Sequence, residues 1–347
     1  MEPIEEKLRE EAKRLLAEKK VDVIVGYEEG TLPLVATPCF ITAPEEAERL
    51  VWNCYCTHNL AKFVHDIISE HKTLQKRQKP EQRTKKVVGV VARGCTTRSL
   101  LIHLQEKQYA REEIVIIGVP CRGYVDRRKL AARLDGKEII GGGLNGETLT
   151  VKTAGGETGV PVNDIIADNC ITCRFNNPLL PDVMTGDAAP PMDAAREYAA
   201  IEEFEKLSPE ERWAYFQKEM AKCIRCYACR NACPSCYCRS CFVEQSQPQW
   251  IGIGGDESDT MVFQLMRLYH MVGRCVDCGF CSDVCPMGVD LRKYLKKLDK
   301  DDFELFGHRA GVSLDEPATL STFSEADHEK FIFNPAAKGE APAGHGK

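Results

Sequence analysis

Residues 223–241 read CIRCYACRNACPSCYCRSC, so that seven of the nineteen residues in this stretch are cysteine. Four of them have the spacing C-x2-C-x2-C-x3-C and are followed by a proline: Cys223, Cys226, Cys229 and Cys233. The same spacing, again followed by a proline, recurs later in the chain: Cys275, Cys278, Cys281 and Cys285. Because buried structural cysteines follow no spacing rule, the repeat indicates that these thiols act together.

The doubled spacing is the signature of a bacterial ferredoxin that binds two [4Fe-4S] clusters. Three closely spaced thiolates can contact one face of a cluster, and the fourth, on a proline-directed turn, reaches the other cluster. This predicts one cluster on Cys223, Cys226, Cys229 and Cys285. It predicts the other cluster on Cys233, Cys275, Cys278 and Cys281. Zinc sites use pairs of C-x2-C rather than such triplets, which makes zinc the weaker interpretation.

The composition agrees with metal chemistry in a reducing compartment. The chain has 347 residues, 18 cysteines and a net charge of −6. Its N-terminus, MEPIEEKLREEAKRLLAEKK, is a charged helix-forming segment rather than a signal peptide, and apolar runs such as 114–120 are too short to cross a membrane. We therefore expect a cytoplasmic protein, in which cysteines bind metal more often than they form disulfides. The negative charge argues against general nucleic-acid binding.

The first half of the sequence alternates predicted helices and strands. An amphipathic helix is expected at 2–19, and further helices at 45–52, at 60–68 and from Thr96 or Thr97 to Gln105. Short β-branched strands are expected at 21–25, 87–91 and 114–117, and a hairpin at 148–162. This order favours an α/β domain with a mainly parallel sheet.

The second half differs in character. The stretch PLLPDVMTGDAAPP, residues 178–191, contains four prolines and no periodicity. We predict that a linker begins there and that few contacts cross it. A helix-rich, cysteine-rich part follows, with a helix at 260–271. After Asn334 the sequence has low complexity, which is typical of a disordered tail or a docking arm.

Four cysteines of the first half lie where loops can bring them together. Cys95 and Cys121 each follow a predicted parallel strand, and ligand sites in open α/β sheets lie beyond the carboxyl ends of strands. Cys170 and Cys173 form a C-x2-C pair after the predicted hairpin. Four thiolates from three loops could hold a third [4Fe-4S] cluster, with a zinc site or free thiols as alternatives.

Residues 87–187 resemble the beta subunit of deazaflavin-reducing hydrogenases and formate dehydrogenases. The segments that carry the resemblance are VVARGC, IIGVPCRGY, TLTVKTAGGETGVPV and DNCITCRFNNPLLPDVMTGD. The resemblance implies one [4Fe-4S] cluster beside an FAD, with Cys95, Cys121, Cys170 and Cys173 as its ligands. Gly94 departs from the family, which usually has a proline before the first of these cysteines.

A second resemblance covers residues 205–300. Residues 234–274 separate the two cysteine runs, and the first run continues to Cys236 and Cys238. This extended form resembles the dicluster domain of the anaerobic sulfite reductase A subunit and of the cytoplasmic sulfhydrogenase beta subunit. In those families the domain relays electrons between a flavin subunit and a catalytic subunit.

The FAD contacts are less constrained than the cluster ligands. No G-x-G-x-x-G fingerprint occurs, so a standard dinucleotide-binding fold has no support. One candidate phosphate site is the predicted helix N-terminus with its free N–H groups: Gly94, Thr96, Thr97 and Arg98. Other candidates are Arg122, which follows a cluster ligand, and a glycine-rich loop that could equally be a plain strand turn: Gly141, Gly142 and Asn145.

Six cysteines remain without a role: Cys39, Cys54, Cys56, Cys236, Cys238 and Cys241. The favoured interpretation is that they line the clusters as small apolar residues. The alternative is a fourth metal centre, because closely spaced thiols occur in each half.

The two resemblances together imply an α/β flavin and iron–sulfur domain at 1–186 and a linker at 187–204. They further imply a smaller, helix-rich, ferredoxin-like dicluster domain at 205–300 and a partly disordered or partner-docking tail at 301–347. The expected function is an electron-transfer subunit of an anaerobic cytoplasmic oxidoreductase complex. FAD would exchange electrons with deazaflavin, NAD or ferredoxin, and three clusters would connect it to a formate dehydrogenase, hydrogenase or heterodisulfide-reductase-like partner. The alternatives are a flavin-free iron–sulfur relay and the electron-input subunit of a sulfite reductase. No nucleic acid and no membrane insertion are expected.

Overall fold

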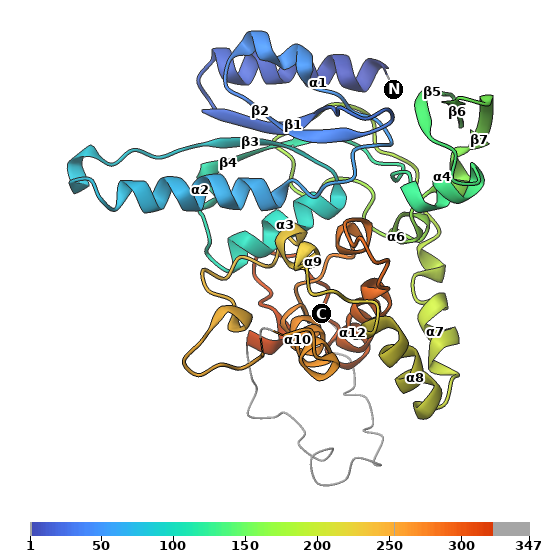
Figure 1. Cartoon of the computed structure of the whole chain (residues 1–347). Helices are drawn as coiled ribbons and strands as arrows, with labels where there is room; N and C mark the ends of the chain where they lie inside the picture. Colours follow the sequence, from blue (N-terminus) through green and yellow to red (C-terminus); the bar gives the residue numbers. More distant parts are fainter. Residues whose placement is uncertain (1, 253, 322–347) are drawn as a thin grey trace.

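A five-stranded sheet organises the first half of the chain (Figure 1). The structure is a computed structural model that describes residues 2–252 and 254–321. The strand order is β2-β1-β3-β4-β8. β1 (Val23–Glu29), β3 (Val88–Ala92), β4 (Ile114–Gly118) and β8 (Val183–Met184) run parallel, and β2 (Ala36–Ile41) pairs antiparallel with β1 at the edge. The prediction of a mainly parallel sheet is confirmed.

Helices cover both faces of this sheet. α1 (Glu2–Ala17) lies over one face, and α2 (Ala61–Gln75) and α3 (Gly94–Gln105) lie over the other (Figure 1). The central strand β3 is buried along its whole length, which explains its continuous run of small and β-branched residues. The core between the layers contains Leu8, Ile24 and Leu100.

Two helix predictions in this half need correction. The segment expected as a helix at 45–52 is a short 3-10 helix, Pro44–Arg49. α3 begins at Gly94 with Arg93 as its N-cap residue, earlier than the predicted threonine cap. The reason is that the Thr97 hydroxyl donates to the Gly94 carbonyl (2.9 Å) inside the first turn and so cannot cap it.

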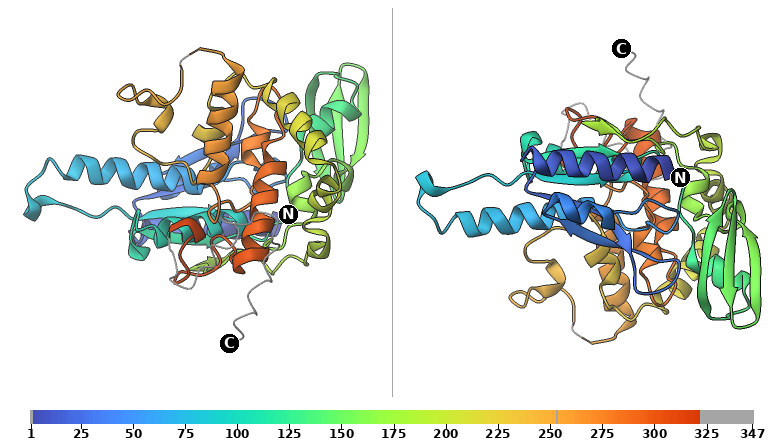
Figure 2. Two further views of the ribbon diagram at one scale, coloured as in Figure 1. Left: turned by 90° about the horizontal axis from the view of Figure 1, so that it is seen from below. Right: turned by 90° about the horizontal axis from the view of Figure 1, so that it is seen from above.

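A separate antiparallel sheet forms one side of the molecule (Figure 2). Its strands are β5 (Ile139–Asn145), β6 (Thr148–Thr153) and β7 (Gly156–Pro161). The hairpin predicted at 148–162 is confirmed as β6–β7, and β5 extends it to three strands. α4 (Arg127–Arg133), α5 (Val162–Ile165) and α6 (Asp168–Ile171) connect this sheet to the rest of the fold.

The second half consists mainly of helices packed around the two cysteine runs. Two short helices lie within the runs: α9 (Ala228–Ala232) and α11 (Phe280–Asp283). Longer helices surround them: α7 (Ala199–Glu205), α8 (Pro209–Met220), α10 (Glu257–His270) and α12 (Leu291–Phe306). The apolar core here includes the cysteines themselves, together with Met220, Leu268 and Leu291.

The proline-rich stretch 178–191 is part of the first-half fold, which corrects its interpretation as the start of a linker. It contributes the edge strand β8, and the Ile116 N–H donates to the Asp182 carboxylate (2.7 Å). A two-residue edge strand tolerates nearby prolines because few ladder hydrogen bonds are needed. The Asn177 side chain then donates to the Ala189 carbonyl (2.9 Å), which holds the following segment in place.

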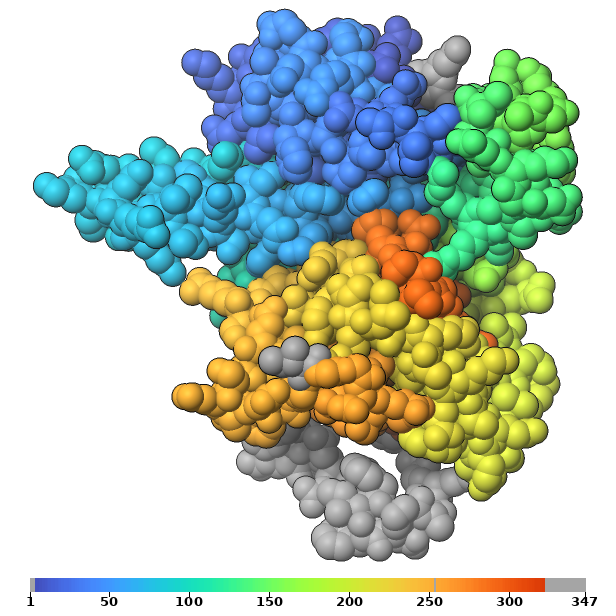
Figure 3. Space-filling view, in the orientation of Figure 1, coloured from blue at the N-terminus to red at the C-terminus, as the bar shows by residue number. Residues whose placement is uncertain are grey.

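The prediction that few contacts cross between the halves was wrong. The buried Arg98 side chain donates to the carbonyls of Val276 (3.1 Å) and Ala310 (2.9 Å). At Gly311, whose φ is +66°, a Cβ would lie 2.2 Å from the Arg98 carbonyl oxygen, so only glycine permits this approach. The two halves therefore pack closely against each other, as the space-filling view shows (Figure 3). The domain boundaries given above stay predictions.

The end of the described chain folds back onto the first half. After α12, the Gln105 amide donates to the Ser313 carbonyl (2.6 Å), which ties residues of the predicted tail to α3. The low-complexity segment after Asn334 lies outside the described residues. Within residues 2–252 and 254–321, no helix combines the length and apolar character that a bilayer span requires.

Three cysteine-lined cavities as the candidate functional site

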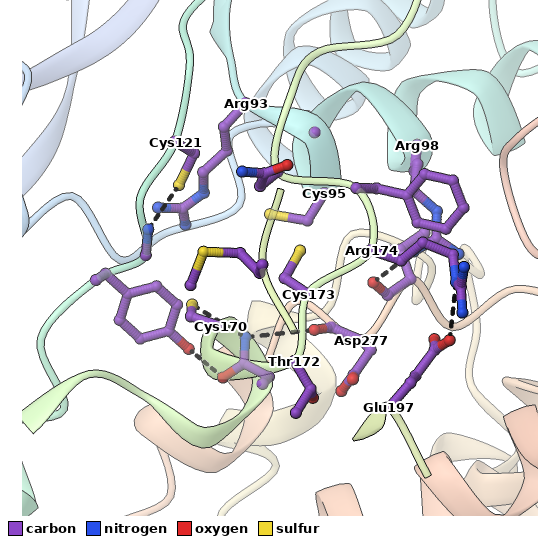
Figure 4. Close-up of a pocket in the computed structure, with 18 of the residues that line it drawn as sticks. Arg93, Cys95, Arg98, Cys121, Cys170, Thr172, Cys173, Arg174, Glu197 and Asp277 are labelled. Carbon is purple, nitrogen blue, oxygen red and sulfur yellow. Dashed lines mark hydrogen bonds and ion pairs between the residues drawn. The ribbon is translucent and has the colours of Figure 1, made fainter. Parts of the chain in front are cut away.

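The first cavity lies beyond the carboxyl ends of β3 and β4 (Figure 4). The four cysteines predicted to act together in the first half all line it: Cys95, Cys121, Cys170 and Cys173. Cys95 is in the first turn of α3, Cys121 follows β4, and the other two belong to α6 and the loop after it. The topology of a parallel sheet explains this convergence, because the loops that follow neighbouring strands meet at the same edge.

Gly94 explains how Cys95 reaches this cavity. A Cβ at Gly94 would lie 1.7 Å from the carbonyl oxygen of Phe175, in the loop that follows Cys173. The absence of a side chain lets the start of α3 pack directly against that backbone. The proline usual in the resembling family would not fit here unless residues 175–177 moved.

Burial disfavours the thiolate form of the cysteines in the first cavity. Burial raises the pKa of Cys121 and of Cys170 above the ordinary value, and it raises the pKa of Cys173 to about 12. Such thiols stay protonated at neutral pH unless a bound metal replaces the protons. Two donors face the sulfur atoms: the Gly123 N–H to Cys121 Sγ (3.3 Å) and the Asn169 amide to Cys170 Sγ (3.6 Å).

The second and third cavities lie in the helical half. The cysteines that line the second cavity are Cys233, Cys275, Cys278 and Cys281. Those that line the third cavity are Cys223, Cys226, Cys229 and Cys285. The chain therefore brings together the same crossed quartets that the doubled spacing predicts. In the third cavity the Gln264 amide donates to Cys223 Sγ (3.3 Å) and the Val289 N–H to Cys285 Sγ (3.4 Å).

A shared backbone conformation shapes the loops of the two runs. Residues two and four positions after the first cysteine of each run have positive φ: Arg225 (51°) and Tyr227 (59°), then Asp277 (53°) and Gly279 (73°). Left-handed conformations cost a non-glycine residue roughly 1–2 kcal/mol each, so they persist only where the surroundings require them. Alternation of this kind turns successive N–H groups inward and makes an anion-binding concavity, which suits an iron–sulfur cluster.

One cysteine quartet surrounds each of the three cavities. In the part of the chain that the structure describes, no three His, Cys, Asp or Glu side chains are placed to hold a single metal ion. Four cysteines around one cavity are the usual ligand set of a [4Fe-4S] cluster.

The three cavities form a row in which the second lies between the first and the third. Val276 and Asp277 line both the first and the second cavity, so one loop separates these two sites. The second and third cavities are joined by the crossed runs, in which α9 and α11 lie in contact. Only the third cavity reaches an exposed apolar surface among the residues described, where Ile224 is 61% and Met287 45% exposed.

The candidate flavin contacts do not gather in one place. Gly94 and Arg98 line the first cavity, and Arg122 is exposed close to Cys121 in the sequence. The Thr96 and Thr97 side chains are fully buried within α3. The remaining candidates lie on β5, in the separate three-stranded sheet, and none of them lines the first cavity: Gly141, Gly142 and Asn145.

Polar side chains around the first cavity were missed by the sequence reasoning. Asp277 accepts two hydrogen bonds from Arg292 (2.7 and 2.9 Å), and Lys296 contacts Glu197 (2.9 Å). Figure 4 shows Asp277 and Glu197 on the wall opposite Cys121. The only signal in the sequence was position, since Asp277 lies inside a C-x2-C pair. The partners of these charges are distant in the chain and could not be predicted.

The six remaining cysteines line none of the three cavities, although Cys236 lies beside the predicted ligand Cys233. Their role next to the clusters stays a prediction. Cys39 and Cys56 are buried in the core of the first half, and Cys54 in the core next to the three-stranded sheet. Cys236 packs at the edge of the helical core, whereas Cys238 is exposed and Cys241 half-buried.

Comparisons with known proteins agree with this description of the cysteines. A family model described as a 4Fe-4S dicluster domain matches residues 219–289. The beta subunit of an F420-dependent formate dehydrogenase from Methanococcus maripaludis is 23% identical over 369 aligned positions, which cover 89% of this chain and 91% of that protein. A second such subunit, from Methanocaldococcus jannaschii, is 32% identical over 102 residues, which cover 29% of this chain and only 26% of that protein.

Among solved structures, a chain of the F420-reducing [NiFe] hydrogenase complex from Methanosarcina barkeri matches with a TM-score of 0.32 and 15% identity. The match covers 51% of this chain and 63% of that one. The protein described here is thus an iron–sulfur protein with a 4Fe-4S dicluster domain, homologous along most of its length to an F420-dependent formate dehydrogenase beta subunit.

Proposed function

We propose that this chain is the electron-transfer subunit of an oxidoreductase complex, in which FAD and three [4Fe-4S] clusters connect a soluble carrier to a catalytic partner. The observation that carries the proposal is the row of three cavities, each lined by four cysteines, that leads from the first-half sheet to the surface. Such a row suits stepwise transfer of single electrons, because neighbouring sites are separated by only one loop or one pair of short helices.

The three ligand sets follow the three cavities. The first cluster is assigned to Cys95, Cys121, Cys170 and Cys173. The second is assigned to Cys233, Cys275, Cys278 and Cys281. The third is assigned to Cys223, Cys226, Cys229 and Cys285. When bound, the clusters supply one-electron chemistry, while the protein supplies position, burial and hydrogen bonds to sulfur.

The carrier and partner are proposed from the relatives. The two curated relatives are named as F420-dependent formate dehydrogenase beta subunits, so we assign a deazaflavin as the carrier and a formate dehydrogenase catalytic subunit as the partner. A hydride-accepting FAD is the component that turns a two-electron carrier into a source of single electrons. We propose that FAD binds near the first cavity, and the support is that two of the candidate contacts, Gly94 and Arg98, line it.

The third cavity is the proposed exit toward the partner. Its ligand Cys226 is the one exposed thiol among the twelve predicted ligands. The exposed side chains of Ile224 and Met287 give the rim an apolar character suited to a protein contact.

The flavin-free relay remains the second candidate function, and one observation favours it. Two of the proposed flavin contacts are already engaged within the protein: the Thr97 hydroxyl accepts from the Leu179 N–H (3.0 Å), and Arg98 donates to two carbonyls of the second half. Both residues therefore have structural tasks that need no flavin.

Acid release of flavin from the full-length protein distinguishes the two candidates. After anaerobic purification and incubation with FAD, the enzyme proposal predicts about one flavin per chain in the fluorescence of the acid supernatant. A matched sample of the Arg98→Lys variant shows whether the guanidinium contributes to flavin binding. Flavin far below one per chain, with the iron content intact, would reject the enzyme proposal in favour of the relay.

A further inference from the structure

Arg93 stands out among the charged residues of the first cavity because it is buried, has no carboxylate partner and leaves a buried nitrogen without a hydrogen bond. Its side chain is 2% exposed and lies next to Cys121 on the cavity wall (Figure 4). One guanidinium nitrogen donates to the Cys56 carbonyl and another to the Thr57 carbonyl (2.6 Å), but Nε has no hydrogen-bond partner. The guanidinium also donates to the His58 carbonyl (3.1 Å) and lies 5.3 Å from the centroid of the Tyr124 ring. These contacts hold the group in place, and no carboxylate neutralises its charge.

Arg98, the other buried arginine of the first cavity, donates to the carbonyls of Val276 and Ala310, and two further cations near the cavities pair with carboxylates. Arg292 makes a two-point contact with Asp277, and Lys296 contacts Glu197 and Asp299. Across the described residues, no Asp or Glu oxygen lies within 4.0 Å of the Arg93 guanidinium. Because an unpaired charge is costly to bury, a negative group should face Arg93 in the working protein.

The second cavity repeats this arrangement. Arg267 is 3% exposed, lines the cavity and donates from Nη2 to the Cys229 carbonyl (3.0 Å). Its Nε and Nη1 atoms have no hydrogen-bond partner, and no described carboxylate pairs with it. Both cavities therefore contain a buried guanidinium, Arg93 or Arg267, that has no carboxylate partner and at least one nitrogen without a hydrogen bond.

A cluster held by four thiolates supplies the missing negative charge. The thiolates outweigh the positive charge of the iron–sulfur core, and the net charge becomes more negative when the cluster is reduced. A fixed cation at the wall therefore stabilises the reduced form more than the oxidised form, which raises the reduction potential. The effect is strengthened because both guanidinium groups are shielded from water.

We propose that Arg93 and Arg267 are the built-in counter-charges of the first and second clusters and that they raise the reduction potentials of these two sites. This inference rests on the proposed function, since it takes the cysteine quartets as cluster ligands. Both arginines act through the clusters as positioning residues, with no role in bond making or breaking. The chemistry that they recognise is an anionic, thiolate-ligated metal cluster.

The test uses the full-length protein and anaerobic potentiometric titration followed by electron paramagnetic resonance. In Arg93→Met, the ratio of reduced to oxidised first cluster at a fixed potential should fall at least tenfold, which for one electron corresponds to a downward shift of about 59 mV. Arg267→Met should lower the reduction potential of the second cluster and leave that of the first cluster unchanged. A Cys121→Ser variant identifies the signal of the first cluster by its absence.

Arg93→Lys and Arg93→Gln separate charge from structure. Lysine keeps the charge but loses most of the contacts to the carbonyls of residues 56 and 57, whereas glutamine keeps a donor without the charge. We expect the first cluster of the lysine variant to keep a reduction potential near that of the wild type. In the glutamine variant the potential should fall, as it does in Arg93→Met. If both neutral variants lose the first cluster and only lysine retains it, the charge is required and the proposal stands.

Two results would overturn the counter-charge role. One is a reduction potential of the first cluster that is unchanged in both neutral variants, Arg93→Met and Arg93→Gln. The other is a lysine variant that behaves like the neutral ones, since that outcome assigns Arg93 to loop structure alone. Failure of the proposed function is seen separately, because wild-type protein would then contain too little iron to fill the first cavity at all.

Discussion

Replacing Cys233 and Cys275 together by alanine should remove no more iron than replacing either one alone. Both residues line the second cavity, although they belong to different cysteine runs. Crossed ligation therefore predicts ~8 iron per chain for Cys233→Ala, for Cys275→Ala and for the double variant, compared with ~12 for the unaltered protein. The measurement is iron and acid-labile sulfide after anaerobic purification.

A second double variant gives the opposite expectation. Cys229 lies only four residues before Cys233 but lines the third cavity, so Cys229→Ala with Cys233→Ala should leave ~4 iron per chain. Cys241→Ala is the matched control, because this cysteine lines no cavity and its loss should leave iron unchanged. The contrary result is loss of two clusters in the Cys233/Cys275 double variant and of one cluster in the Cys229/Cys233 double variant. Each cluster would then be held by the four cysteines of a single run.

Cys121→Ser should separate reduction of the flavin from delivery of electrons to the partner. Loss of this thiol removes the first cluster, so iron falls from ~12 to ~8 per chain while the dicluster domain stays loaded. Reduced deazaflavin should still bleach the flavin, because hydride transfer needs only the flavin. Electrons should then fail to reach the second and third clusters, as followed by rapid mixing and freeze-quench spectroscopy.

Cys39→Ser is the control for this experiment. The Cys39 side chain is buried in the same half of the chain and lines none of the cavities, so its replacement tests the general cost of a buried serine. It should keep ~12 iron and transfer electrons like the unaltered protein. Rapid reduction of the dicluster domain in the Cys121 variant would mean that the first cavity is not on the electron path.

The cysteine quartets could be predicted from the sequence because short covalent spacing and sheet topology determine them. Cysteines with only two residues between them stay neighbours in a tight loop whatever the fold. Loops that follow parallel strands meet at one edge of the sheet. Cys95 and Cys121 are far apart in the chain, yet the register of β3 against β4 brings their loops together. The same reasoning identified the mainly parallel sheet and the hairpin of β6 and β7.

The place of the proline-rich stretch and the contacts of the buried arginines depend on long-range packing that a single sequence does not reveal. The proline-rich stretch looked like a linker because its only strand, β8, has two residues and pairs with a distant strand. The contacts of Arg98 with Val276 and Ala310 could not be predicted, because those residues are distant in the chain, and its role as a phosphate ligand stays a prediction. No pattern in the sequence indicated a role for Arg93, because its distinguishing feature is that no described carboxylate lies next to its buried guanidinium.

The iron and sulfide content of the full-length protein is the most direct test of the account. Three occupied cavities require ~12 iron and ~12 sulfide per chain, purified without oxygen and normalised by quantitative amino-acid analysis. A value near ~8 would contradict the account, because only the dicluster domain would then hold clusters and the first cavity would lose its assigned role.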